Sequence, residues 1–128
     1  MIKLIIDAAS EKIFLMIISN NSVYNITHEN TKINYEKLTI IINDFLLSKN
    51  LKIADFDVIY INVGLGSFAG IRNSMSVVKA FNVAKNIDYY CYNLHDFKDE
   101  KDLSYKSIPN LCKKYKIKKN LINPIYLS

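Results

Sequence analysis

The sequence predicts one domain of the α/β class on a mixed five-stranded sheet, and three observations indicate it. Apolar residues form three short strand-like segments before any helical pattern begins. The apolar spacing then becomes helical, and a later strand-like segment runs into a loop that holds all three glycines of the chain. A second helical segment and one more short strand follow. The predicted element order within residues 1–97 is β-β-β-α-β-α-β.

The start of the chain predicts a meander of strands. In residues 2–7, Ile2, Leu4 and Ile6 alternate with Lys3 and Ile5 before Asp7, which is typical of a largely buried strand. After a turn-like stretch, residues 13–18 form a second apolar run, and a weaker alternating pattern covers residues 22–28. We expect the first two strands to pair antiparallel and the third to close the meander.

Helices and strands alternate in the next part. Helical spacing begins at Asn34, the predicted N-cap, and predicts a helix that ends near Asn50. Residues 57–63 are β-branched and aromatic, which predicts a buried strand. A second helix is predicted over residues 71–86 and a short strand over residues 89–92.

The composition fits one globular domain in a reducing compartment. The chain has 128 residues, of which 50% are hydrophobic and 23% charged. No apolar run approaches the roughly 18 residues that span a bilayer, and no leader-like pattern opens the chain. We therefore expect a cytoplasmic protein without membrane contact. Cys91 and Cys112 lack CxxC spacing and a nearby histidine pair, so neither a disulfide scaffold nor a zinc site is indicated.

The positive charge of the chain is local. The formal net charge is +5, and without five clustered lysines the remaining 12 basic residues balance the 12 acidic ones. Such a cluster can contact RNA phosphates, but it is more often a solvated tail. The candidate RNA-contact residues are Lys113, Lys114, Lys116, Lys118 and Lys119.

The glycine-rich loop at residues 64–70 is the most informative motif. A sharp turn from strand to helix needs residues that tolerate unusual backbone angles, and it leaves free N–H groups at the helix start. That geometry can hold an anion, although a tight turn alone also explains the glycines. The spacing is not that of the GxGxxG dinucleotide motif. The candidate anion-binding residues are Gly64, Gly66, Ser67, Gly70 and Arg72.

Residues 64–72, with the sequence GLGSFAGIR, resemble the signature GPGSFTGVR of the TsaB (YeaZ) family. Residues 5–7 (IID), 34–38 (NYEKL) and 124–127 (PIYL) also resemble that family, so the likeness covers roughly the first 95 residues and the last five. It implies one half of the actin-like (ASKHA, RNase H-like) fold over residues 1–97. Residues 98–128 would add a charged linker, a short basic helix near residues 107–115 and a terminal strand-like segment.

The resemblance also implies a role. TsaB proteins are partner subunits of the machinery that puts a threonylcarbamoyl group on adenosine next to the tRNA anticodon. By this likeness the chain would bind and activate a TsaD-like catalytic subunit, in an assembly with a TsaE-like ATPase, and would meet tRNA only indirectly. It would need no cofactor or metal and do no chemistry itself. A homodimer is expected when the chain is alone.

The predicted partner surface lies on the two helices and the glycine loop. Both helices carry more apolar side chains than one core-facing stripe requires, although the two helices could also simply pack on each other. The candidate interface residues are Ile40, Leu47, Ser67, Phe68, Arg72, Met75, Val78 and Lys79.

Two other functions remain open at this point. A small phosphotransferase or nucleotide hydrolase would use Asp7 and the glycine loop, although Asp7 is more readily explained as a turn former and one half-domain cannot close around a substrate. A basic RNA-binding module would use the lysine cluster. His28 and His95 stand too far from other ligands or nucleophiles to suggest a metal site or a peptidase.

Overall fold

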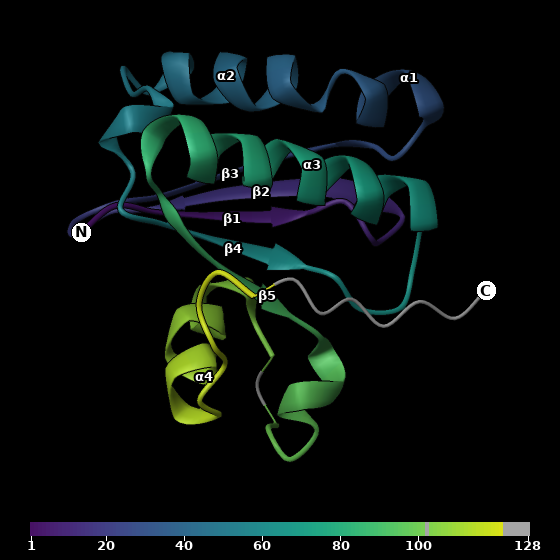
Figure 1. Ribbon diagram of the computed structural model, residues 1–128, viewed down its shortest axis with the longest axis vertical. Coiled ribbons are helices and arrows are strands. Elements are labelled where there is room, and N and C mark those ends of the chain that lie inside the picture. The colour runs from purple at the N-terminus through teal and green to yellow at the C-terminus, as the bar shows by residue number, and fades with distance from the viewer. Residues whose placement is uncertain (102, 122–128) are drawn as a thin grey trace.

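The structure, a computed structural model, describes residues 1–101 and 103–121 and is built on one mixed sheet (Figure 1). Strands β1 (Lys3–Asp7), β2 (Lys12–Ile18) and β3 (Val23–Glu29) form the antiparallel meander. Strands β4 (Val58–Asn62) and β5 (Asp88–Tyr92) continue the sheet parallel to β1. The spatial order is β3-β2-β1-β4-β5, which confirms the predicted α/β fold and its five-stranded mixed sheet.

Three helices cover one face of the sheet. They are α1 (Lys32–Glu36), α2 (Leu38–Ser48) and α3 (Phe68–Lys85), and a 3-10 turn, η1 (Ile53–Asp55), leads from α2 into β4. In Figure 1, α2 and α3 lie side by side above the sheet. This layer places the glycine loop and the start of α3 at the edge where β1 and β4 end.

The predicted N-cap Asn34 is wrong. The hydroxyl of Thr31 accepts the backbone N–H of Asn34, so Thr31 is the N-cap and the helix begins earlier. The single predicted helix is in fact two, because the backbone leaves the helical region at Lys37 (ψ 21°) between α1 and α2. Similarly, α3 begins at Phe68, three residues before the predicted start at Ile71.

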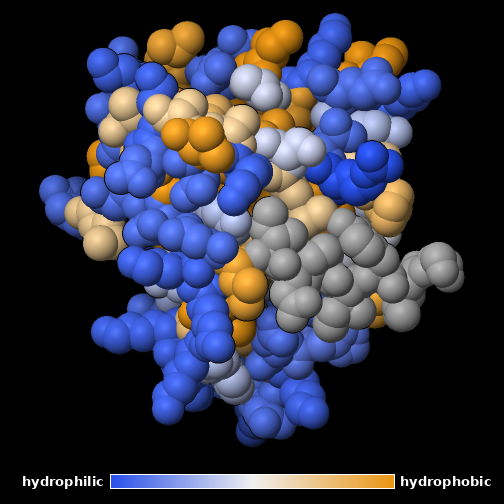
Figure 2. Space-filling model, viewed as in Figure 1, coloured by the Kyte–Doolittle hydropathy of each residue, from blue (hydrophilic) through white to orange (hydrophobic). Residues whose placement is uncertain are grey.

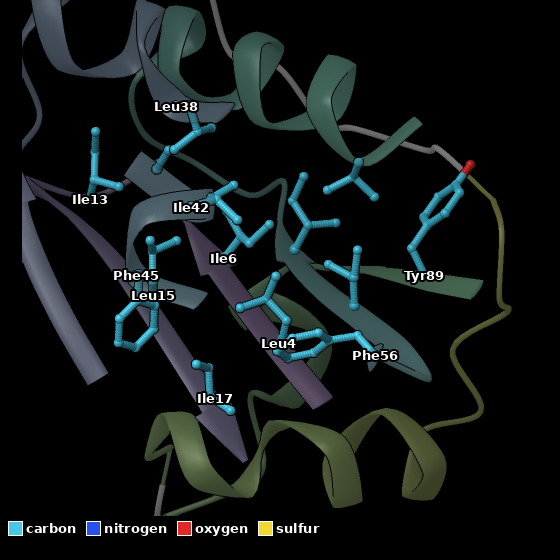
Figure 3. Packing of buried hydrophobic residues seen from close by; sticks show 14 of the residues in the cluster. Leu4, Ile6, Ile13, Leu15, Ile17, Leu38, Ile42, Phe45, Phe56 and Tyr89 are labelled. Atoms are coloured by element: carbon cyan, nitrogen blue, oxygen red, sulfur yellow. The ribbon is translucent and has the colours of Figure 1, made fainter. Parts of the chain in front are cut away.

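The main core lies between the sheet and these helices (Figure 3). Because side chains alternate along a strand, Leu4 and Ile6 of β1 point to the helices while Ile5 between them points to the opposite face. Apolar side chains of β2 and α2 meet them in Figure 3. The fully buried labelled members of this core are Leu4, Ile6, Ile13, Leu15, Ile17, Leu38, Ile42 and Tyr89.

The segment after β5 covers the other face of the sheet. It forms η2 (Leu94–Phe97), η3 (Tyr105–Ser107) and α4 (Ile108–Lys114), and α4 lies below the sheet in Figure 1. A second core therefore fills that face, made of Ile5, Met16, Val58, Tyr60, Tyr92, Phe97, Ile108, Leu111 and Cys112. Helix α4 confirms the predicted basic helix, but its apolar side is part of the core. The predicted apolar segment at residues 125–127 lies outside the described residues.

The end of the described chain adds to the edge of the sheet. Lys119 pairs with Tyr90 in an antiparallel bridge, and the backbone N–H of Asn120 donates to the Tyr89 carbonyl at 2.7 Å. The Asn120 side chain accepts from Tyr89 N–H at 2.9 Å and donates to Asp88 at 2.9 Å. These bonds occupy backbone groups of β5 that would otherwise form an open edge. Within the described ranges, no helix is both long enough and apolar enough to cross a membrane.

Candidate functional site

The carboxylate of Asp7 lies at the carboxyl end of β1, where ligands commonly bind in open α/β sheets. It is 2% exposed and accepts hydrogen bonds from four groups. Ala9 N–H donates to Oδ1 at 2.9 Å, Asn62 Nδ2 to Oδ2 at 3.1 Å and Tyr105 OH to Oδ2 at 2.7 Å. The Ser10 hydroxyl adds a longer bond to Oδ2 at 3.2 Å. The bond from Ala9 is the turn-forming contact that the sequence favours for Asp7.

Tyr105 closes this end of the sheet. Its ring stacks on Phe14 of β2, with centroids 3.8 Å apart and planes 15° from parallel. Burial, and after it the negative charge of Asp7, raise the pKa of the Tyr105 hydroxyl above its usual value. The hydroxyl therefore stays protonated and donates to Asp7. Among residues 1–101 and 103–121, the donors to Asp7 are four neutral groups, and together they join β1, β4 and η3 at this end of the sheet.

The glycine loop lies directly against the turn between β1 and β2. A Cβ on Gly66, whose φ is +155°, would come 2.1 Å from the Ala9 carbonyl oxygen, and one on Gly70 would come 2.0 Å from that of Ala8. The backbone N–H of Ser67 donates to the same Ala9 carbonyl at 2.8 Å. The glycines therefore permit a close approach of two backbones.

Several N–H groups of the loop are used inside the chain. Gly64 N–H donates to Asn62 Oδ1 at 2.9 Å, and Gly70 N–H donates to the hydroxyl of Ser67 at 3.1 Å, which makes Ser67 the N-cap of α3. With Ser67 N–H bonded to Ala9, three donors of the predicted anion site have partners. The tight-turn explanation accounts for the glycines, and anion binding by Gly64, Gly66, Ser67, Gly70 and Arg72 stays a prediction.

The predicted interface residues divide into two groups. Ile40 is 58% exposed, Leu47 65% and Phe68 53%, and Arg72 and Lys79 are also exposed. The Arg72 guanidinium lies 5.5 Å from the centre of the Phe68 ring. Ser67 and Met75 are half-buried, and Met75 packs against the main core. All of these residues belong to the helical layer, on α2, on α3 or at the N-cap of α3.

The assignment of Val78 to the interface is wrong. Its side chain is 1% exposed and belongs to the main core, because it lies on the side of α3 that faces the sheet. The apolar residues on two sides of α3 do not distinguish the core-facing stripe from the outer one in the sequence. Substitution of Val78 would disturb the core.

On α1, α2 and α3, two exposed large apolar residues were missed by the sequence prediction. Ile33 of α1 is 66% exposed and Val83 of α3 is 75% exposed. Ile33, Ile40 and Leu47 recur at intervals of seven, a spacing that could have revealed Ile33. Figure 2 shows apolar surface over α2 and over the carboxyl-terminal half of α3. We call this set the outer helical surface: Ile33, Ile40, Leu47, Phe68, Arg72, Lys79 and Val83.

The lysine cluster is exposed around and after α4. Lys114 pairs with Glu100 at 2.8 Å and Lys119 with Asp88 at 3.5 Å. Lys113, Lys116 and Lys118 are exposed and form no ion pair with a described residue. RNA contact by the cluster stays a prediction.

The two cysteines are not reactive thiols. Burial raises the pKa of Cys91 to about 12, and burial with the nearby Asp96 and Cys91 raises that of Cys112 to about 12. Both are therefore neutral thiols. Among residues 1–101 and 103–121, no three His, Cys, Asp or Glu side chains converge as metal ligands.

Comparisons with known proteins bear on the fold. No protein-family model matches the sequence, and no curated protein matches it. Among solved structures, YeaZ from Pseudomonas aeruginosa superposes with a TM-score of 0.66 and 17% identity, over 72% of this chain and 43% of that one. The fold is YeaZ-like. A second P. aeruginosa structure, described as similar to the peptidase YeaZ, gives the same values.

Structures of a second protein, RuvC, also superpose on this chain. RuvC from Thermus thermophilus, solved with a Holliday junction substrate, superposes with a TM-score of 0.52 and 9% identity over 77% of this chain and 68% of that one. Identities this low show the fold alone. The sheet and its helices are consistent with a single actin-like, RNase H-like half-domain. This chain spans less than half the length of the YeaZ structures it matches.

Proposed function

We propose that this chain is a non-catalytic binding subunit resembling TsaB. It pairs through the outer helical surface with a TsaD-like catalytic subunit and activates it for threonylcarbamoylation of the adenosine next to the tRNA anticodon. A TsaE-like ATPase joins the larger assembly, and the chain meets tRNA only through it. The observation that carries the proposal is the set of exposed apolar side chains on α1, α2 and α3, in a YeaZ-like fold.

The outer helical surface has the character of a protein interface. Ile33, Ile40, Leu47 and Val83 are each more than half exposed, and burying one such side chain stabilises a complex by roughly 1.5–3 kcal/mol. Apolar side chains that stay in water add no hydrophobic stabilisation to the folded domain. Clusters of this kind commonly mark protein–protein contacts.

The start of α3 adds features that suit recognition. Phe68 and Arg72 lie together there, and a shallow hollow beside them is lined by Tyr35 and Glu36 of α1 and by Asn73 of α3. An exposed aromatic ring next to a guanidinium is a common anchor in interfaces. This is the part of the chain whose sequence resembles the TsaB signature.

The state of Asp7 supports a binding role over an enzymatic one. A carboxylate that acts on a substrate or metal must present free lone pairs to it. Here both oxygens of Asp7 accept hydrogen bonds from neutral donors of the chain, and the Tyr105 hydroxyl occupies Oδ2. A phosphotransferase that uses Asp7 would first have to displace the segment that contains Tyr105.

The proposal is tested by reconstituting the tRNA modification. The TsaD-like and TsaE-like proteins of the same cell are incubated with tRNA, threonylcarbamoyl-AMP as the group donor and ATP, with and without this chain, and modified adenosine is measured by mass spectrometry. We expect modification to rise at least tenfold when the wild-type chain is added. The same rise with a chain carrying Ile40→Glu and Leu47→Glu would contradict the assigned surface, and no rise with the wild type would contradict the function.

A further inference from the structure

A hollow of about 560 Å³ lies at the end of the sheet opposite the glycine loop. Its floor is the start of β1, β4 and β5, and its wall is α4 with the turn that follows. A volume in this range is typical of pockets that take small ligands. Residues from opposite ends of the chain therefore line one concavity.

The floor of the hollow is aromatic. Tyr60 of β4 and Tyr90 of β5 stack with centroids 5.3 Å apart and planes 11° from parallel. Neither hydroxyl hydrogen-bonds to a residue of the described chain. Burial, with Cys112 and Tyr90 nearby, raises the pKa of Tyr60 to about 12, so its hydroxyl remains a donor at neutral pH. Tyr90 is only half-buried, so part of its surface remains accessible.

The rim of the hollow is positively charged. Lys3 of β1, Lys113 of α4 and Lys116 of the following turn line it, and none forms an ion pair within the described ranges. Two acids also line it, but Asp57 accepts the backbone N–H of Ile2 at 2.7 Å and Asp88 is paired with Lys119 at 3.5 Å. Four lysines therefore face two acids, which favours an anionic occupant.

We propose that this hollow binds a nucleotide, either free or as an unpaired residue of RNA. Lys113, Lys116 and Lys3 hold the phosphate, and the base lies against Tyr90. Cations beside an accessible aromatic ring are the combination by which proteins hold the phosphates and bases of single-stranded nucleic acid without strict sequence preference. The site is independent of the proposed partner role, because α4 lies on the side of the sheet away from α2 and α3 (Figure 1).

The test is titration calorimetry of the full chain with adenosine 5′-monophosphate at low salt. We expect a dissociation constant below 1 mM, on the scale of weak small-ligand sites at about −4 kcal/mol. Lys113→Gln with Lys116→Gln should weaken binding at least tenfold, and Tyr90→Leu at least threefold. The matched control is Lys49→Gln with Lys85→Gln, two exposed lysines of the helical layer, which should leave the affinity unchanged.

Further titrations distinguish the source of the nucleotide and test each half of the site. Inorganic phosphate and adenosine should each bind at least fivefold more weakly than the monophosphate. Tighter binding of a short single-stranded RNA that competes with the monophosphate would identify RNA as the source. No binding of the monophosphate at 5 mM, or binding equally tight in the double lysine variant, would overturn the proposal. RNA binding without competition from the monophosphate would overturn it as well, since a general lysine surface would explain that result.

Discussion

The hydroxyl of Tyr105 donates to Oδ2 of Asp7 at 2.7 Å, joining two residues 98 positions apart. The contact ties the carboxyl-terminal segment to the end of the first strand. The contact helps to position η3 and α4 on the sheet. It also occupies Asp7, the carboxylate that a phosphotransferase or nucleotide hydrolase of this fold would use.

Replacing Tyr105 by Phe should lower the stability measurably. The ring would still stack on Phe14, but the buried Asp7 would lose one of its donors. We expect the free energy of unfolding in urea to fall by about 1–3 kcal/mol. Tyr24→Phe, at an exposed tyrosine of β3, is the control and should change it by less than about 0.5 kcal/mol. Equal effects of the two variants would show that the Asp7 bond contributes nothing.

Stability should fall as the solution becomes alkaline. The pKa of Tyr60 in the folded chain is raised to about 12, so the unfolded chain loses this proton first as the pH rises above 10. Ionisation then favours unfolding, and the stabilisation present below pH 10 is lost toward pH 12. The urea midpoint measured at pH 8, 10 and 11 should decline over that window, and Tyr60→Phe should decline less. A midpoint that stays constant or rises between pH 10 and 11 would be incompatible with these pKa values.

Gly70→Ala should destabilise the chain although alanine favours helices. A Cβ at this position would lie 2.0 Å from the Ala8 carbonyl oxygen, and the backbone at both sites would have to move. Such overpacking costs typically 1–3 kcal/mol, more than the ~1 kcal/mol gained in helix propensity. Thermal unfolding followed by circular dichroism measures the effect. Ser76→Ala, on the exposed side of the same helix, should be neutral or slightly stabilising, and the same outcome for Gly70→Ala would remove the close-approach explanation.

The carboxyl-terminal segment should behave as part of the core. Leu111 is 6% exposed in the second core, so Leu111→Ala should lower the free energy of unfolding by about 2–5 kcal/mol. The exposed neighbour Asn110 serves as the control through Asn110→Ala. A single cooperative transition, with both faces of the sheet unfolding together, is expected. A loss below about 0.5 kcal/mol at Leu111 would mean that α4 is only loosely attached.

Patterns of short range in the sequence predicted much of this fold. Alternating or continuous apolar residues marked the strands, and the glycine loop marked the start of α3 within three residues. The single helix predicted from Asn34 is two helices, and Thr31, the N-cap of the first, was missed because Thr31 and Asn34 are both good capping residues. Val78 was assigned to the outer surface because α3 is apolar on two sides, and only packing shows which side meets the sheet.

Long-range relationships were beyond sequence reasoning. Nothing near Tyr105 indicates that its hydroxyl reaches Asp7, and nothing near Lys113 indicates that it shares a hollow with Lys3 and Tyr90. The charged residues at 98–102 predicted a linker, whereas the apolar residues of α4 that follow belong to the second core. Contacts of this kind depend on how the chain folds back, which apolar periodicity does not encode.

The most direct test of the proposed role is to titrate this chain against the TsaD-like protein of the same cell and to measure complex formation by sedimentation velocity. The wild type should form a heterodimer at micromolar concentration, and Ile40→Glu with Leu47→Glu should weaken it at least tenfold, because two charges would enter an apolar contact. Asn25→Glu with Thr27→Glu, on exposed positions of β3, is the matched control and should bind like the wild type. Absence of a complex with the wild type, or an equally tight complex with the Ile40 and Leu47 variant, would contradict the account.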